Sequence, residues 1–322
     1  VTLTWWGQVP PSNGRYGVVN GVMALGNWYP QLAVQRNGVW QRHQYTPIGD
    51  AFFTEIADYD VTVRAPANVT VASSASQVAR TAGAWVMHAE DMRDFALGIA
   101  ANVQTLTRKV DNVVITVYHQ PGHADGAKVS LDTAEAAMRW YSKKLGPYPF
   151  ASLAIVEVPG GGQHNAQEHA GLFFIRSDYF TPLLAGEYTA HELAHAWFFA
   201  AVGNDQIHDP WLDEALATSI SMDFYRETSP KDYAGLWGKW GGTPEEFANS
   251  PVINVGIFDF KAGEGGAYFW TVYRQGAAFL RVVREAMGDD AYWQALREYY
   301  ERNKGGIARP QDLLRALRQA SS

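Results

Sequence analysis

The segment His191-Glu192-Leu193-Ala194-His195 constrains this chain more than any other. In an α-helix, residues four apart lie on one face, one turn apart, so a helix here would bring both imidazoles to one ion. Glu192 would then reach a water molecule bound beside them. We expect one helix over residues 188–201, ending near Gly203. The alternative is a helix that carries two ordinary surface or core histidines.

A third ligand candidate is Glu214, which follows His195 after eighteen intervening residues. Asp209-Pro210 predicts the start of a second helix, because Asp is a good N-cap and Pro suits the first helical position. If this helix lies antiparallel beside the first, Glu214 faces back toward the histidines. Asp213 is the rival ligand, but on a helix its side chain points about 100° away. Two histidines and one carboxylate leave a fourth position for water, as in catalytic zinc sites. The sequence therefore predicts one Zn²⁺ ion held by His191, His195 and Glu214.

The first 120 residues have the periodicity of strands. Alternating apolar and polar residues predict short strands, with a turn at Asp111-Asn112 between the last two. These strands are expected at 59–63, 69–72, 84–88, 103–107 and 113–118. Such spacing is typical of a β-sandwich-like domain, and Val1 begins abruptly, as in a domain whose first strands are missing. We assign residues 1–122 to this β-rich domain.

From about residue 124 the periodicity becomes helical. Five apolar residues share one face of a helix that should end at Gly146-Pro147. They are Ala127, Leu131, Ala134, Met138 and Tyr141. Strands are expected at 152–158 and 172–175, and helices at 266–287, 289–303 and 310–320. We therefore expect residues 123–322 to form a mostly helical catalytic domain with a small sheet.

Composition excludes several classes of protein. Lys and Arg number 26 against 33 Asp and Glu, a net charge of −7 without a basic run, so we expect no nucleic-acid partner. No apolar stretch is long enough for a membrane span. The chain has no Cys, which excludes thiolate catalysis and Cys-ligated metals. A chain that begins at Val1 fits a removed signal peptide or a trimmed N-terminus, and favours an extracytoplasmic location. We expect a monomer.

At its metal-binding residues the chain resembles the aminopeptidase N family of zinc metallopeptidases, the gluzincins, of bacterial type. Residues 191–198 match the zinc helix of the family, and 211–215, Trp-Leu-Asp-Glu-Ala, resemble its W-L-x-E-G/A block. Residues 28–30 and 93–96 are similar to segments of its β domain, and 146–150 to the segment before its catalytic sheet. The resemblance implies a thermolysin-like catalytic domain after a β domain. It also implies that the C-terminal helical domain usual in the family is absent here.

The resemblance implies a role for Tyr273. The family carries a Tyr in a Y-x-K-G block, and residues 273–276 are Tyr-Arg-Gln-Gly, with Gln275 in place of Lys. A phenol beside the metal can donate a hydrogen bond where negative charge develops on the carbonyl oxygen. Tyr268 is the nearest competitor for this role.

The resemblance also implies a site for the substrate's amino group. Residues 165–169, Asn-Ala-Gln-Glu-His, occupy the place of the family's G-x-M-E-N loop. Glu168 keeps the carboxylate that binds the free α-amino group, while Gln167 and His169 depart from the pattern. We expect all three to contact the substrate: Gln167, Glu168 and His169. An edge strand here could also hydrogen-bond an extended peptide through its backbone.

Together these residues predict a zinc-dependent peptidase, an aminopeptidase in which Glu192 acts as general base toward a peptide substrate. One alternative is an endopeptidase or broad peptidase on the same zinc site, because a missing C-terminal domain would leave the cleft open. A second alternative is a non-catalytic binding module on a peptidase fold. Such a module would be expected to have lost Glu192 or a metal ligand, and all are intact.

Overall fold

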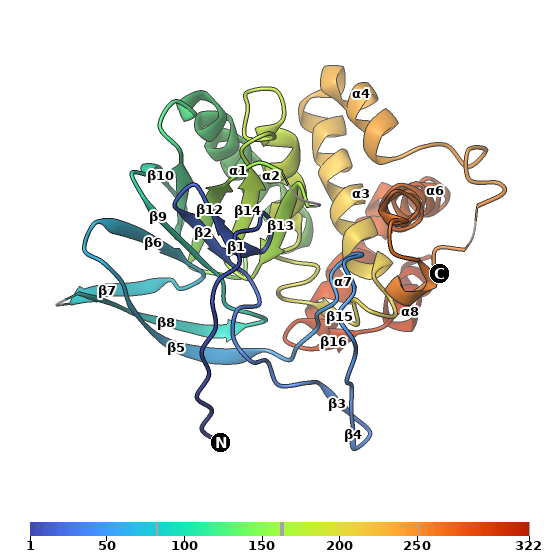
Figure 1. Cartoon of the computed structure of the whole chain (residues 1–322). Coiled ribbons are helices and arrows are strands. Elements are labelled where there is room, and N and C mark those ends of the chain that lie inside the picture. Colours follow the sequence, from blue (N-terminus) through green and yellow to red (C-terminus); the bar gives the residue numbers. More distant parts are fainter. Residues whose placement is uncertain (82, 162–163, 251, 322) are drawn as a thin grey trace.

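The computed structural model describes residues 1–81, 83–161, 164–250 and 252–321. Figure 1 shows strands of the first half of the chain on one side and helices of the last third on the other, with two helices and a mixed sheet between them. This arrangement confirms the predicted fold class, a β-sandwich-like N-terminal part followed by a mostly helical part with a small sheet.

Two antiparallel sheets form the N-terminal part. The first has the order β1 (Tyr16–Val19), β2 (Val22–Leu25), β9 (Leu97–Ala101), β6 (Val69–Ser73). The second has the order β5 (Ala57–Arg64), β8 (Ala84–Met92), β7 (Gln77–Thr81). Apolar residues of both sheets share one core, which includes Leu25, Val71, Trp85, Met87 and Leu97. Two further short strands, β3 (Gln35–Arg36) and β4 (Val39–Trp40), pair with each other.

A five-stranded mixed sheet forms the middle of the molecule. Its order is β10 (Gln104–Val110), β11 (Val113–His119), β12 (Ser152–Val158), β14 (Leu172–Arg176), β13 (Ala166–His169). Strands β11, β12 and β14 are parallel, and the two outer strands are antiparallel to their neighbours. Strands β10 and β11 thus join a sheet whose other strands follow residue 122. The division into domains at 122/123 stays a prediction.

Both faces of this sheet are covered. On one face lie α1 (Ala124–Leu145) and α2 (Ala185–Ala194), and all five residues predicted for the inner face of α1 are buried. On the other face, Val156 and Phe174 pack against Ala24, Ala72 and Ala96 of the N-terminal part. Because these alanines are small, the two sheets can approach closely. Packing on both faces therefore holds the mixed sheet, including its edge strand β13, in place.

The remaining helices are α3 (Trp211–Thr228), α4 (Pro230–Trp240), α5 (Gly265–Tyr268), α6 (Gly276–Met287), α7 (Asp289–Asn303) and α8 (Pro310–Ala320). A 3₁₀ turn covers Ile257–Asp259, and β15 (Gly203–Asn204) pairs with β16 (Ile307–Ala308). The helices predicted at 289–303 and 310–320 are confirmed with the same bounds. The one predicted at 266–287 is interrupted by a π-helical segment, Phe269–Gln275.

The prediction of one helix over 188–201 is wrong. Helix α2 ends at Ala194, and the chain continues in wider turns, in which the amides of Ala200 and Ala201 bond the carbonyls five residues earlier. Gly203 begins a strand instead of capping the helix, because its amide bonds the carbonyl of Gly306 at 3.0 Å. Phe199 lies in these turns with φ +142°, a region that strains any residue other than Gly.

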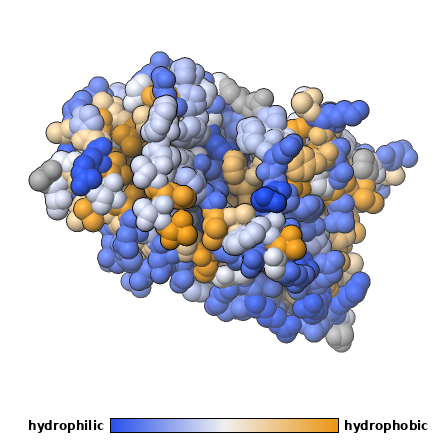
Figure 2. All heavy atoms as spheres, turned by 60° about the horizontal axis from the view of Figure 1, so that its bottom comes forward, coloured by the Kyte–Doolittle hydropathy of each residue, from blue (hydrophilic) through white to orange (hydrophobic). Residues whose placement is uncertain are grey.

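Within the described residues, no helix combines the length and apolar character needed to cross a bilayer. Large apolar side chains are exposed along the N-terminal segment and the β3–β4 hairpin, among them Leu3, Trp6 and Trp40. On the face shown in Figure 2, apolar residues form several separate groups among hydrophilic ones.

Candidate metal centre and cleft

Three ligand candidates meet at one point beneath a cleft. His191 lies in α2, His195 immediately follows its last residue, and Glu214 lies in the first turn of α3. Glu214 Oε2 is 3.3 Å from His191 Nε2 and 3.4 Å from His195 Nε2, and the two Nε2 atoms are 3.3 Å apart. The spacing in the sequence thus corresponds to convergence in space.

The donor set fits a zinc ion. All three side chains are buried, and Glu214 Oε2 makes no hydrogen bond to the described residues. His195 Nδ1 donates to the carbonyl oxygen of Phe198 at 3.1 Å, which leaves the Nε2 lone pair for a metal. Burial lowers the pKa of His191, whereas at His195 the effect of burial is outweighed by the Glu214 carboxylate, which raises the pKa. Burial opposes a charge on Glu214, but His195 and His191 hold its pKa below the ordinary value.

Asp213 has other partners. Its carboxylate accepts hydrogen bonds from Asn204 Nδ2 at 2.9 Å and from Gln206 Nε2 at 2.7 Å. Glu214 is therefore the carboxylate that lies next to both histidine Nε2 atoms, and its choice over Asp213 as the metal ligand stays a prediction. Two further sets of donor atoms also lie within 4.8 Å of one another, Glu168–His195–Asp213 and Asp50–Glu168–Glu214. Each includes a residue of the first set, so all belong to one buried acidic cluster.

Glu192 lies at the cleft beside the ligand candidates. It is buried, lines the cleft, and its Oε2 has no hydrogen-bond partner among the described residues. Burial raises the pKa of Glu192 to about 8, with a further increase from the nearby Glu214 carboxylate and a decrease from His195. A free carboxyl group with a raised pKa is suited to accept and return a proton.

Tyr273 reaches the same point from the π-helical segment. Its hydroxyl donates to Glu214, and its ring stacks on that of His191 with centroids 5.9 Å apart. Trp240 also stacks on His191, at 5.1 Å. A π-helical segment is rare and occurs frequently at functional sites.

Tyr268 lines the same cleft. Gly49, at φ +60°, packs directly against the Tyr268 ring: a Cβ atom at residue 49 would be only 2.5 Å from the Tyr268 hydroxyl, so a larger residue would displace this side chain.

Two of the three predicted substrate-binding residues line the cleft. Gln167 and Glu168 lie on edge strand β13, and Glu168 accepts a weak hydrogen bond from Gln206 Nε2 at 3.4 Å. Burial, and next the Asp50 carboxylate, raise the pKa of Glu168. His169, the third, is not among the described residues that line the cleft, and its Nδ1 pairs with the buried Asp94. A contact of His169 with the substrate stays a prediction.

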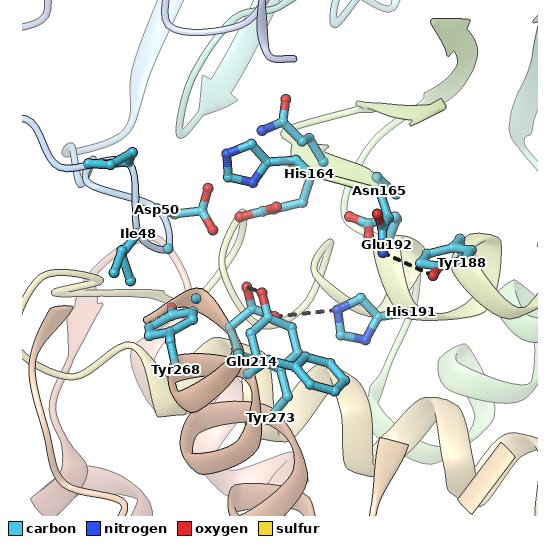
Figure 3. Close-up of a pocket in the computed structure, with 18 of the residues that line it drawn as sticks. Ile48, Asp50, His164, Asn165, Tyr188, His191, Glu192, Glu214, Tyr268 and Tyr273 are labelled. Carbon is cyan, nitrogen blue, oxygen red and sulfur yellow. Dashed lines mark hydrogen bonds and ion pairs between the residues drawn. The ribbon is translucent and has the colours of Figure 1, made fainter. Parts of the chain in front are cut away.

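The cleft has a volume of about 420 Å³ (Figure 3). Sequence reasoning missed several residues that line it, including Asp50, His164, Tyr188 and Trp240. Asp50 comes from the segment between β4 and β5, and Figure 3 shows its carboxylate directed into the pocket, opposite His191. Its Oδ1 pairs with Arg15. No sequence spacing links these residues to the metal-binding segment, so only the folded chain reveals them.

A helix with two histidines, a free glutamate beside them and a third ligand on the next helix define the site of a metallopeptidase. Residues 129–322 match the family model described as Peptidase family M1 domain. This match spans more than half of the chain. The chain therefore belongs to peptidase family M1, the aminopeptidase N family of metallopeptidases, which confirms the resemblance seen in the sequence.

Several proteins named as aminopeptidases align with more than two thirds of this chain. Aminopeptidase N of Lactobacillus delbrueckii subsp. lactis is 28% identical over 252 residues, which are 70% of this chain and 29% of the relative. Aminopeptidase N of Streptomyces lividans is 23% identical over 289 residues, 82% of this chain and 34% of the relative. Aminopeptidase 2 of Candida albicans is 25% identical over 245 residues, 69% of this chain and 26% of the relative. The matched part of the chain thus spans about a quarter to a third of the length of these relatives.

Proposed function

We propose that this chain is a zinc-dependent aminopeptidase, which removes the first residue from peptides with a free amino group. The observation that carries the proposal is the convergence of His191, His195 and Glu214 beside Glu192, whose Oε2 has no hydrogen-bond partner among the described residues. Membership of peptidase family M1 and the names of the relatives support it.

His191, His195 and Glu214 would hold the ion, and Zn²⁺ bound there supplies a Lewis acid for the scissile carbonyl and lowers the pKa of a water molecule. Glu192 takes the proton of the attacking water and returns it to the leaving amine. Its position favours this cycle, because the side chain is buried beside the ligand candidates and its Oε2 makes no hydrogen bond to the described residues. The phenol of Tyr273 donates a hydrogen bond to the carbonyl oxygen as negative charge develops there.

Glu168 and strand β13 position the peptide. The Glu168 carboxylate faces the cleft and binds the substrate's ammonium group through a charge-assisted hydrogen bond. Strand β13 is at the edge of the five-stranded sheet, so its outer side can pair with an extended peptide backbone. Fixing the amino group sets the distance to the scissile bond, which limits cleavage to the first residue.

The test compares a free and an N-acetylated fluorogenic peptide of the same sequence, with zinc-loaded enzyme and with enzyme treated with a chelator. We expect zinc-dependent cleavage and a preference of at least about tenfold for the free amine. Equal cleavage of both peptides would indicate an endopeptidase. If zinc binds and neither peptide is cleaved, the chain is a binding module and the proposal is wrong.

A further inference from the structure

A second cavity, of about 510 Å³, lies beside the catalytic cleft. The two share Pro47 and His164, and Figure 3 shows His164 on the opposite side of the cleft from His191. Among the described residues that line the second cavity there is no metal ligand candidate. Its walls combine aromatic rings and side-chain amides, and they include Tyr16, Tyr45, Phe52, Asn13 and Asn27.

The two cavities differ in charge. The charged side chains that line the catalytic cleft are all carboxylates: Asp50, Glu168, Glu192 and Glu214. Of the described residues that line the second cavity, only Arg15 carries a formal charge. His164, at the boundary, is kept neutral because burial, followed by the nearby Arg15, lowers its pKa. A substrate that extends across both cavities would therefore meet negative charge near the metal and positive charge beyond it.

Arg15 is held firmly in this position. Its guanidinium donates to Asp50 and to Asn27 Oδ1, the latter at 3.4 Å, and lies 4.9 Å from the centre of the Phe52 ring. The side chains of Arg15 and Asp50 are 14% and 10% exposed. Asp50 offsets the charge of Arg15 on the side of the catalytic cleft, but Asp50 does not line the second cavity. The guanidinium is therefore the charged group that the second cavity presents to a substrate, and at close range it repels a second cation.

We propose that the second cavity receives the side chain of the substrate's first residue, and that Arg15 excludes basic side chains from it. This inference rests on the proposed aminopeptidase function. Glu168, which would bind the ammonium group, lines the cleft and also a small void that Arg15 lines. With the ammonium at Glu168 and the scissile carbonyl at the metal centre, the side chain of the first residue extends toward Pro47 and His164. The aromatic walls then favour neutral and aromatic side chains.

The experiment compares two fluorogenic amides whose side chains have the same four-carbon stem, norleucyl and lysyl. For the wild-type enzyme we expect kcat/KM for the norleucyl substrate to exceed that for the lysyl substrate at least about tenfold. Arg15→Gln should reduce this ratio at least about threefold, and Arg15→Lys, which keeps a cation, should largely restore it.

The chain offers a matched control in Arg36. Its guanidinium pairs with the buried Asp205 at 2.9 Å and lies 5.3 Å from the centre of the Phe53 ring, as Arg15 does with Asp50 and Phe52. Arg36 lines neither the catalytic cleft nor the second cavity. Arg36→Gln therefore reports the cost of losing a partly buried Arg–Asp pair. We expect it to leave the ratio of the two substrates unchanged.

Calorimetric titration of norleucinamide and lysinamide separates this inference from the proposed function, because binding does not require turnover. If wild-type protein binds norleucinamide more tightly than lysinamide, and Arg15→Gln loses this preference, the cavity assignment is supported. This holds even if the wild-type enzyme hydrolyses neither fluorogenic substrate. A lack of hydrolysis would refute only the aminopeptidase function. Two results overturn the inference. One is that wild-type protein treats the norleucyl and lysyl compounds alike, and the other is that Arg15→Gln leaves their ratio at the wild-type value.

Discussion

The phenol hydroxyl of Tyr273 donates a hydrogen bond to the carboxylate of Glu214, 59 positions earlier in the chain. This contact joins the π-helical segment to the first turn of α3 at the centre of the cleft. Glu214 is a candidate metal ligand, so in the proposed mechanism the Tyr273 hydroxyl would lie near the carbonyl group of the substrate. Two consequences follow, one for catalysis and one for the retention of zinc.

Tyr273→Phe should lower kcat about 10²- to 10³-fold with little change in KM, because one donor to the developing oxyanion is lost. The ring that stacks on His191 is kept, so the zinc content should stay close to one ion per chain. Steady-state kinetics and metal analysis check both points. Tyr268→Phe is the control from the same cleft. An unchanged kcat in Tyr273→Phe, with a large loss in Tyr268→Phe, would assign the role to Tyr268.

Glu168→Ala should weaken cleavage of free-amine peptides and barely affect acetylated ones. A charge-assisted hydrogen bond to an ammonium group contributes about 1.5–3 kcal/mol, which corresponds to roughly 10- to 150-fold in kcat/KM. Measuring both peptides with both enzymes gives a double-mutant cycle in which the amino group is one partner. If the ratio of the two peptides is the same in wild type and Glu168→Ala, the carboxylate does not bind the amine.

Phe199→Gly should be more stable than Phe199→Ala by about 1 kcal/mol. Both variants lose the same aromatic side chain, but only Gly adopts φ +142° without strain, and this gain exceeds the usual entropic cost of Gly. Chemical unfolding of the two variants measures the difference. At the neighbouring Phe198, which does not have a positive φ, the order should reverse, with Ala more stable than Gly. The same order at both positions would show that residue 199 is not strained.

The sequence predicted those parts of the structure that depend on local spacing. The three ligand candidates converge as expected: His191, His195 and Glu214. Four residues make about one helical turn, and the eighteen residues after His195 are enough to bring the next helix back beside the first. The bounds of α1, α7 and α8 were also predictable, because Gly and Pro mark their ends. The strand at Gly203 was not, since it depends on the pairing of Gly203 with the distant Gly306.

The rest of the site depends on long-range packing. Asp50 belongs to the N-terminal part but lines a cleft whose candidate metal ligands are about 140 or more positions later, and its partner Arg15 lies still further from them in the sequence. No periodicity links such distant residues. His169 was assigned to the substrate by its neighbour Glu168, whereas in the structure its Nδ1 pairs with Asp94, a residue 75 positions earlier that no local spacing connects to it.

The most direct test of the proposed mechanism is the behaviour of Glu192→Gln, measured as zinc content and turnover of a free-amine substrate in the same preparation. Glu192 is the proposed general base and not a ligand, so the variant should keep about one zinc per chain and lose at least about a hundredfold in kcat. His195→Ala should lose the metal, and Glu298→Gln on α7, outside the cleft, should change neither quantity. A zinc-loaded Glu192→Gln enzyme with nearly full activity would contradict the mechanism.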